Sequence, residues 1–88
     1  MPESIAARVR AAIATTQHID IGAVTAEKTF AELGLDSLDG LKIMFALEEE
    51  FGVVIPDDQA KSYVTVAQVI AGINSLVERQ PVAASDRQ

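Results

Sequence analysis

The chain has 88 residues, a mass of 9.4 kDa and a formal net charge of −6, so its size allows one small domain. It has no cysteine and one histidine, which excludes disulfides, thiolate metal sites, a cysteine nucleophile and a cluster of histidine ligands. The acidic composition argues against nucleic-acid binding, and the lack of a long apolar run or a cationic signal segment predicts a cytoplasmic protein with no membrane span.

The first predicted element is an amphipathic helix over residues 4–16. Its apolar residues Ile5, Val9 and Ile13 recur every four positions. Residues 17–36 lack helical periodicity, and their six apolar residues predict a packed loop. These residues are Ile19, Ile21, Val24, Phe30, Leu33 and Leu35. Within the loop, the pattern from Thr29 to Glu32 predicts a capped helical turn that Gly34 ends.

Three more helices are predicted after the loop. The strongest runs from Ser37 to Phe51, and Gly52 follows its last turn. A short helix is expected from Asp57 to about Tyr63 and another from about 65 to 78. The apolar stripe of the last helix is Val66, Val69, Ile70, Ile73 and Val77.

These elements predict an all-α fold. We expect a small four-helix bundle, with three main helices and one short helix, and a long packed loop between the first two. The bundle would occupy residues 1–80, followed by a disordered tail over residues 81–88.

The negative charge is concentrated in one segment. Between Glu32 and Asp58 the chain has eight acidic residues and one basic residue, a net charge of −7, while the remainder nets +1. Such a run is either a solvated helix surface or a docking surface for basic partners, and composition alone leaves both open.

The helix from Ser37 to Phe51 has two apolar stripes on opposite sides. We expect one stripe to face the core: Ile43, Met44, Leu47 and Phe51. The other stripe, Leu38, Leu41 and Phe45, should lie at the surface beside acidic residues, as in a protein-binding face. The alternative is that loop residues such as Phe30 and Leu35 cover Phe45.

Ser37 stands at the entrance of this helix. The free backbone N–H groups and the positive end of the helix dipole would stabilise a phosphate attached to its hydroxyl. No histidine or lysine lies nearby in the sequence to activate it, so Ser37 is a poor nucleophile and a good acceptor for modification by another enzyme. The simpler alternative is an ordinary serine N-cap.

Several motifs occur together in a fixed order. Leu33–Asp39 (Leu-Gly-Leu-Asp-Ser-Leu-Asp) is followed by Ala46–Gly52 (Ala-Leu-Glu-Glu-Glu-Phe-Gly), then by Ile55–Asp57 (Ile-Pro-Asp) and by Thr65-Val66. In this order and spacing the chain resembles an acyl carrier protein of the free-standing, type II kind, over roughly residues 4–77.

The resemblance implies a non-catalytic carrier. Ser37 would receive a 4′-phosphopantetheine arm from coenzyme A through a phosphopantetheinyl transferase, and Asp36 would help to hold the magnesium ion used in that transfer. No intrinsic metal site is implied. The arm ends in a thiol that carries acyl groups as thioesters, and in this family the acyl chain can retreat between the helices.

The resemblance also implies a docking face on a monomeric carrier. Its partners would be acyl-transferring and synthase enzymes with basic patches, in fatty-acid, polyketide or related lipid synthesis. The matching acidic positions are Asp39, Glu48 and Glu49, and the apolar positions between them are Leu38, Leu41 and Phe45.

Two residues depart from the family pattern. Lys42 stands where fatty-acid-synthesis members usually carry an acid, although it could pair with Asp39 instead. Gly40 is an unusual helix-interior glycine that would allow close approach of another segment or loosen the first turn. With a less acidic third helix, these departures favour a specialised pathway. The remaining alternatives are an aminoacyl or D-alanyl carrier, and an unmodified acidic helical adaptor.

Overall fold

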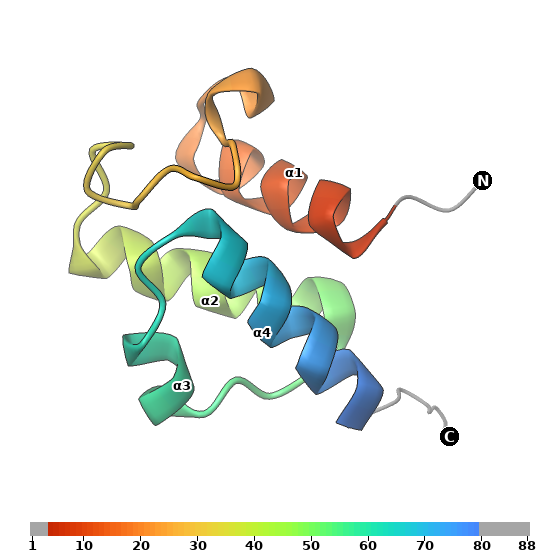
Figure 1. Cartoon of the computed structure of the whole chain (residues 1–88). Coiled ribbons are helices and arrows are strands. Elements are labelled where there is room, and N and C mark those ends of the chain that lie inside the picture. Colours follow the sequence, from red (N-terminus) through yellow and green to blue (C-terminus); the bar gives the residue numbers. More distant parts are fainter. Residues whose placement is uncertain (1–3, 80–88) are drawn as a thin grey trace.

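The computed structural model describes residues 4–79, which form an all-helical bundle (Figure 1). The elements in chain order are α1 (Ile5–Gln17), the short 3₁₀ helix η1 (Ile21–Ala23), α2 (Ser37–Phe51), α3 (Asp57–Lys61) and α4 (Val66–Arg79). The predicted architecture of three main helices and one short helix is confirmed. The predicted domain end at residue 80 and the tail over 81–88 lie outside the described residues.

Local capping explains where the main helices begin and end. Ser4 caps α1, because its hydroxyl accepts a hydrogen bond from the Ala7 backbone N–H at 3.1 Å. At the other end His18 takes a left-handed conformation, with φ of 57°. Helix α2 ends at Gly52, which is also left-handed and whose N–H donates to the Glu48 carbonyl.

The loop between α1 and α2 is held by side chains. Glu32 accepts from the Thr29 backbone N–H at 2.9 Å and Thr29 accepts from the Glu32 N–H at 3.0 Å, so the predicted capped turn is confirmed. Arg10 of α1 donates to the carbonyl oxygens of Val24 and Ile21, at 2.6 and 3.1 Å. An isolated bridge pairs Thr29 with Thr65, which ties the loop to the start of α4.

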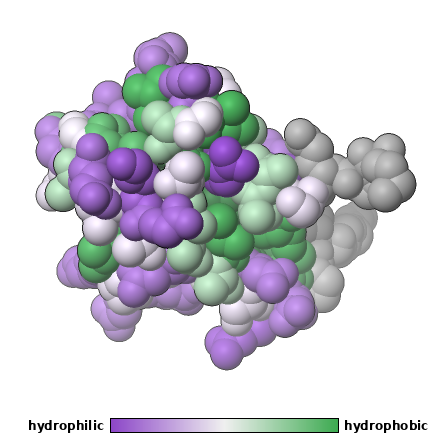
Figure 2. Space-filling view, turned by 45° about the horizontal axis from the view of Figure 1, so that its top comes forward, coloured by the Kyte–Doolittle hydropathy of each residue, from purple (hydrophilic) through white to green (hydrophobic). Residues whose placement is uncertain are grey.

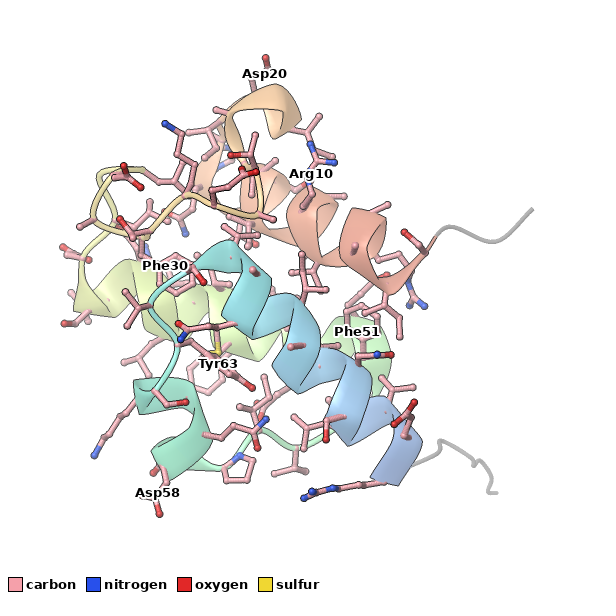
Figure 3. The ribbon with its side chains drawn as sticks, viewed as in Figure 1. Arg10, Asp20, Phe30, Phe51, Asp58 and Tyr63 are labelled. Carbon is pink, nitrogen blue, oxygen red and sulfur yellow. The ribbon has the colours of Figure 1, made fainter. Side chains whose placement is uncertain are left out.

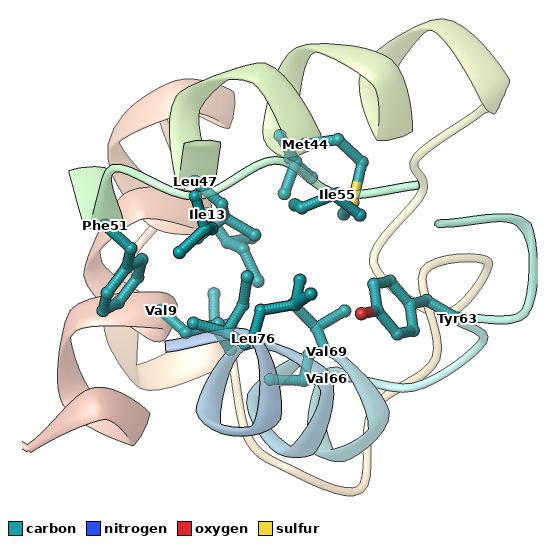
Figure 4. Packing of buried hydrophobic residues seen from close by; sticks show 14 of the residues in the cluster. Val9, Ile13, Met44, Leu47, Phe51, Ile55, Tyr63, Val66, Val69 and Leu76 are labelled. Atoms are coloured by element: carbon teal, nitrogen blue, oxygen red, sulfur yellow. The ribbon is translucent and has the colours of Figure 1, made fainter. Parts of the chain in front are cut away.

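The core lies between α1, α2 and α4, with contributions from the loops (Figure 4). The expected α2 stripe of Ile43, Met44, Leu47 and Phe51 is buried. Two expectations for the rest of the core need correction. Ile21 is exposed, because η1 turns it outward while Val24 is fully buried. Leu76 of α4 is buried although it was not expected in the stripe.

Helix α3 is one turn and ends at Lys61, two residues before the expected end. Tyr63 follows it as part of the core, and its backbone N–H donates to the Ala60 carbonyl. A short helix of this kind depends on packing for its stability, because one turn makes too few hydrogen bonds to offset the entropy of ordering it.

Polar and apolar residues alternate over the face seen in Figure 2. Exposed apolar residues are normal on a small domain, and a contiguous group is the informative case. No helix within residues 4–79 is long and apolar enough to cross a membrane.

Candidate functional site around Ser37

Ser37 is the first residue of α2 and is exposed. The residue that caps the helix is Asp36, so the alternative of Ser37 as an ordinary N-cap is wrong. Within residues 4–79 the Ser37 hydroxyl makes no hydrogen bond. The hydroxyl is therefore accessible at the positive end of a fifteen-residue helix.

Two acidic residues fix the backbone around the serine. The Asp36 side chain accepts from the Asp39 N–H at 2.9 Å, and the Asp39 side chain accepts from the Asp36 N–H at 3.1 Å. The bond from the Asp39 N–H is the main reason why the pKa of Asp36 lies below its ordinary value. Asp36 is thus an ionised carboxylate next to Ser37. Among residues 4–79, no three histidine, cysteine or acidic side chains gather into a metal-binding group.

A pocket of about 640 Å³ opens beside Ser37. Three segments that are distant in the sequence line it: the end of the packed loop, the first half of α2, and the region of α3. The lining residues are Phe30, Leu35, Asp36, Ser37, Gly40, Leu41, Met44, Ala60, Lys61 and Tyr63. In Figure 3, Phe30 and Tyr63 lie near α2 on the side of the molecule that α3 occupies. The volume and the mainly apolar lining suit a small organic group.

The outer stripe of α2 is exposed as expected. Leu38, Leu41 and Phe45 are 67%, 53% and 62% exposed. The alternative that Phe30 and Leu35 cover Phe45 is wrong, because both loop residues pack against the core instead. Three large apolar side chains therefore lie exposed on one helix face, a pattern that is common in protein interfaces.

The acidic residues near this stripe differ in what they contact. The Glu48 carboxylate accepts from the Ile55 N–H at 2.8 Å, so it also holds the segment after α2. Asp39 belongs to the helix cap, and Glu49 is exposed. Lys42 is exposed and does not pair with Asp39, since the ion pair found within residues 4–79 is Arg8–Glu50.

The pocket could not be found from the sequence. Met44 was predicted to lie in the core, Ala60 and Tyr63 only within the short helix, and Lys61 had no assigned role. Lys61 is distant from Ser37 in the sequence but shares the pocket with it. Only the tertiary fold, which places the region of α3 beside the first half of α2, brings these residues together. Gly40 also lines the pocket, and no atom apart from its chain neighbours and the backbone of α2 lies within 4 Å of the position that a Cβ would take there. The presence of glycine at position 40 is therefore not explained by close approach of another segment within residues 4–79.

Comparison with known proteins identifies the family of this chain. Residues 7–73 match the family described as "Phosphopantetheine attachment site". The acyl carrier protein of Thermosynechococcus vestitus is 45% identical over 71 residues, which cover 80% of this chain and 88% of that protein. The acyl carrier proteins of two Helicobacter pylori strains are 46% identical over 63 residues, or 70% of this chain and 81% of those proteins.

The chain belongs to the acyl carrier protein family. The cofactor of this family is 4′-phosphopantetheine, and its members are carriers rather than catalysts. The chemistry around Ser37 fits that group: a free hydroxyl, backbone donors at a helix N-terminus that suit a phosphate, and an apolar pocket alongside.

Proposed function

We propose that Ser37 is the attachment site of 4′-phosphopantetheine and that the chain presents acyl intermediates to lipid-synthesis enzymes. The observation that carries this proposal is the exposed Ser37 hydroxyl at the first position of α2, beside an apolar pocket. The bound arm ends in a thiol, which supplies the thioester chemistry that a chain without cysteine cannot provide.

Asp36 and Asp39 fix the backbone around the exposed Ser37, which would be modified by a phosphopantetheinyl transferase. A phosphoester bond would form between Ser37 Oγ and the pantetheine phosphorus of coenzyme A, and the bond from that phosphorus to the nucleotide half would break. The serine proton would pass to a base of the transferase, because no base among residues 4–79 hydrogen-bonds to the hydroxyl. The ionised Asp36 would help to position the magnesium ion of that enzyme.

The apolar stripe of α2 is the proposed contact surface for partner enzymes. Leu38, Leu41 and Phe45 would fill apolar depressions on a partner, while Asp39, Glu48 and Glu49 would meet a basic patch around them. The chain would act as a monomer in the cytoplasm, since one small carrier must visit several enzymes in turn.

Lys42 makes this surface unusual and supports a specialised pathway. It lies among the acids of α2 and forms no ion pair within the described residues. A charge of the wrong sign at an interface disfavours partners that carry a base opposite it. We therefore propose partners with an acidic residue inside their basic patch, in fatty-acid, polyketide or related lipid synthesis.

Intact-mass measurement tests the attachment site. Incubation of the folded chain with coenzyme A, magnesium and a broad-specificity phosphopantetheinyl transferase should add one arm, and Ser37→Ala should abolish the addition. Ser37→Ala should fold normally, with stability within about 0.5 kcal/mol of the unchanged chain, because the hydroxyl makes no hydrogen bond. An adduct that persists in Ser37→Ala contradicts the site, and no adduct beside a labelled control carrier favours an unmodified adaptor.

The loading enzyme tests the cargo and the pathway. Aminoacylation of the modified chain by an amino-acid-activating enzyme, without acyl transfer by lipid-synthesis enzymes, would favour the aminoacyl or D-alanyl alternative. If Lys42 selects partners, Lys42→Glu should raise turnover by fatty-acid-synthesis enzymes several-fold. Lys28→Glu makes the same change of charge at an exposed position in the loop and should have little effect. Equal turnover by the unchanged chain and Lys42→Glu would remove the case for a dedicated pathway.

A further inference from the structure

Tyr63, the one tyrosine of the chain, lines the Ser37 pocket. Tyr63 is 9% exposed, and its hydroxyl oxygen accepts a hydrogen bond from Gln59 Nε2 at 2.6 Å. Burial raises the pKa of Tyr63, so the phenol is neutral near pH 7. The ring is therefore a neutral, anchored part of the pocket wall.

A glycine on α4 makes room for this ring. A Cβ at Gly72 would overlap the Tyr63 hydroxyl, and it would lie 2.6 Å from Cζ and 2.8 Å from Cε1 of the same ring. The edge of the phenol thus lies directly on the α4 backbone. Any side chain at position 72 would force the ring to move.

The ring lies between the pocket and α4, because it lines the pocket and its edge contacts Gly72. The pocket lining includes Tyr63 and Met44 but none of the α4 residues Val66–Arg79. Val69 and Ile73 of α4 are fully buried in the core. Figure 4 shows the Tyr63 hydroxyl pointing toward α4 near Val69, with Met44 and Ile55 on the side of α2.

We infer that Tyr63, seated on Gly72, sets the maximum length of acyl chain that this carrier shelters, and that its cargo is a short acyl chain. This inference rests on the proposed function of the Ser37 site. An acyl chain that enters beside Ser37 meets the phenol before it can reach α4. A longer chain must either displace the ring from its contacts with Gln59 and Gly72 or leave its end in water.

The test uses the modified chain, after intact mass has shown one arm on Ser37. The chain is loaded with butanoyl, hexanoyl, octanoyl, decanoyl and dodecanoyl groups, and the rate of thioester hydrolysis in mild alkali is measured for each. Each methylene that becomes buried should slow hydrolysis by up to about fourfold, from the transfer free energy of a methylene group. For the unchanged chain the slowing should stop by octanoyl.

Variants of Tyr63 and Gly72 test whether these residues set the acyl length at which the slowing of hydrolysis stops. Tyr63→Val should allow the slowing to continue at least one step further along the series. Tyr63→Phe should keep the original limit, because it retains the ring. Gly72→Ala should push the ring into the pocket and shorten the limit by a step. Val64→Ala is the matched control, because Val64 is exposed next to Tyr63 and does not line the pocket.

Two results would overturn the inference: slowing that continues beyond octanoyl in the unchanged chain, or the same limit in Tyr63→Val. If Tyr63→Val does not fold, the NMR signals of the Tyr63 ring in the unchanged chain decide. They should shift with each added step up to octanoyl and no further, and ring signals insensitive to the acyl group would refute the contact. Failure to load any arm refutes the proposed function instead, so the two outcomes are distinct.

Discussion

The two glycines inside α-helices, Gly40 and Gly72, should respond in opposite ways to alanine. Gly40 lies within α2, its φ is not positive, and no atom apart from its chain neighbours and the backbone of α2 lies within 4 Å of the position of a Cβ. Gly72 lies within α4, where a Cβ would overlap the Tyr63 ring. Substitution by alanine therefore changes helix propensity equally at both positions. The added methyl group enters open space at Gly40 but overlaps a buried aromatic ring at Gly72.

The expected magnitudes follow from these surroundings. In a helix interior alanine is favoured over glycine by about 1 kcal/mol, so Gly40→Ala should raise the free energy of unfolding by about that amount. For a domain of this size 1 kcal/mol corresponds to a rise in Tm of about 4–8 °C. At Gly72 the same gain is offset by overpacking, which costs about 1–3 kcal/mol. Gly72→Ala should therefore be less stable than Gly40→Ala by about 1–3 kcal/mol.

Urea denaturation followed by far-ultraviolet circular dichroism measures both free energies of unfolding. The m-value should stay the same in the two variants, because neither substitution changes the surface exposed on unfolding by much. Equal stability of Gly40→Ala and Gly72→Ala would refute the contact between Tyr63 and α4. A loss of stability in Gly40→Ala would show that the open space at Gly40 is filled in solution.

Two further predictions concern charged side chains. The pKa of Asp36 lies below its ordinary value of about 3.9, so the stability that this carboxylate contributes is complete above that value and is lost as pH falls through the folded-state pKa. The stability advantage of the unchanged chain over Asp36→Asn should therefore shrink in acid, as acid titration of unfolding would show. An advantage independent of pH would contradict the role of the ionised cap with Asp39. The Arg8 guanidinium pairs with Glu50 at 3.0 Å and lies 4.4 Å from the centre of the Phe51 ring. Arg8→Ala should therefore lower the free energy of unfolding by about 1–2 kcal/mol in denaturant titration. If the contact with Phe51 dominates, most of this difference between the unchanged chain and Arg8→Ala should persist at about 0.5 M salt, which screens the exposed ion pair.

Much of the fold could be predicted because its signals are local. Capping residues and left-handed glycines mark the helix ends, and they act through hydrogen bonds within a few residues. The bounds of α2 and the capped turn at Thr29 were therefore predicted correctly. The two stripes of α2 were also separated correctly, because helical periodicity alone places Leu47 and Phe45 on different sides.

The predictions from the sequence were wrong or incomplete where contacts with other parts of the fold determine whether a side chain is buried or bonded. Ile21 and Val24 were both expected to pack the loop, but only Val24 is buried, while Arg10 holds the carbonyls of both residues. Leu76 was missed because the buried side of α4 depends on how that helix is rotated against α1 and α2. Glu48 was assigned only to docking, yet its carboxylate also binds the Ile55 N–H.

Four features could be predicted from the sequence alone: the helices, their ends, the exposed apolar stripe and the serine at the entrance of α2. Each of them depends on periodicity or on contacts a few residues apart. The tertiary structure alone decided the pocket. Its walls come from the loop, α2 and the region of α3, and the close contact of Tyr63 with Gly72 joins residues on different elements. Such contacts depend on how whole elements pack, which no local pattern specifies.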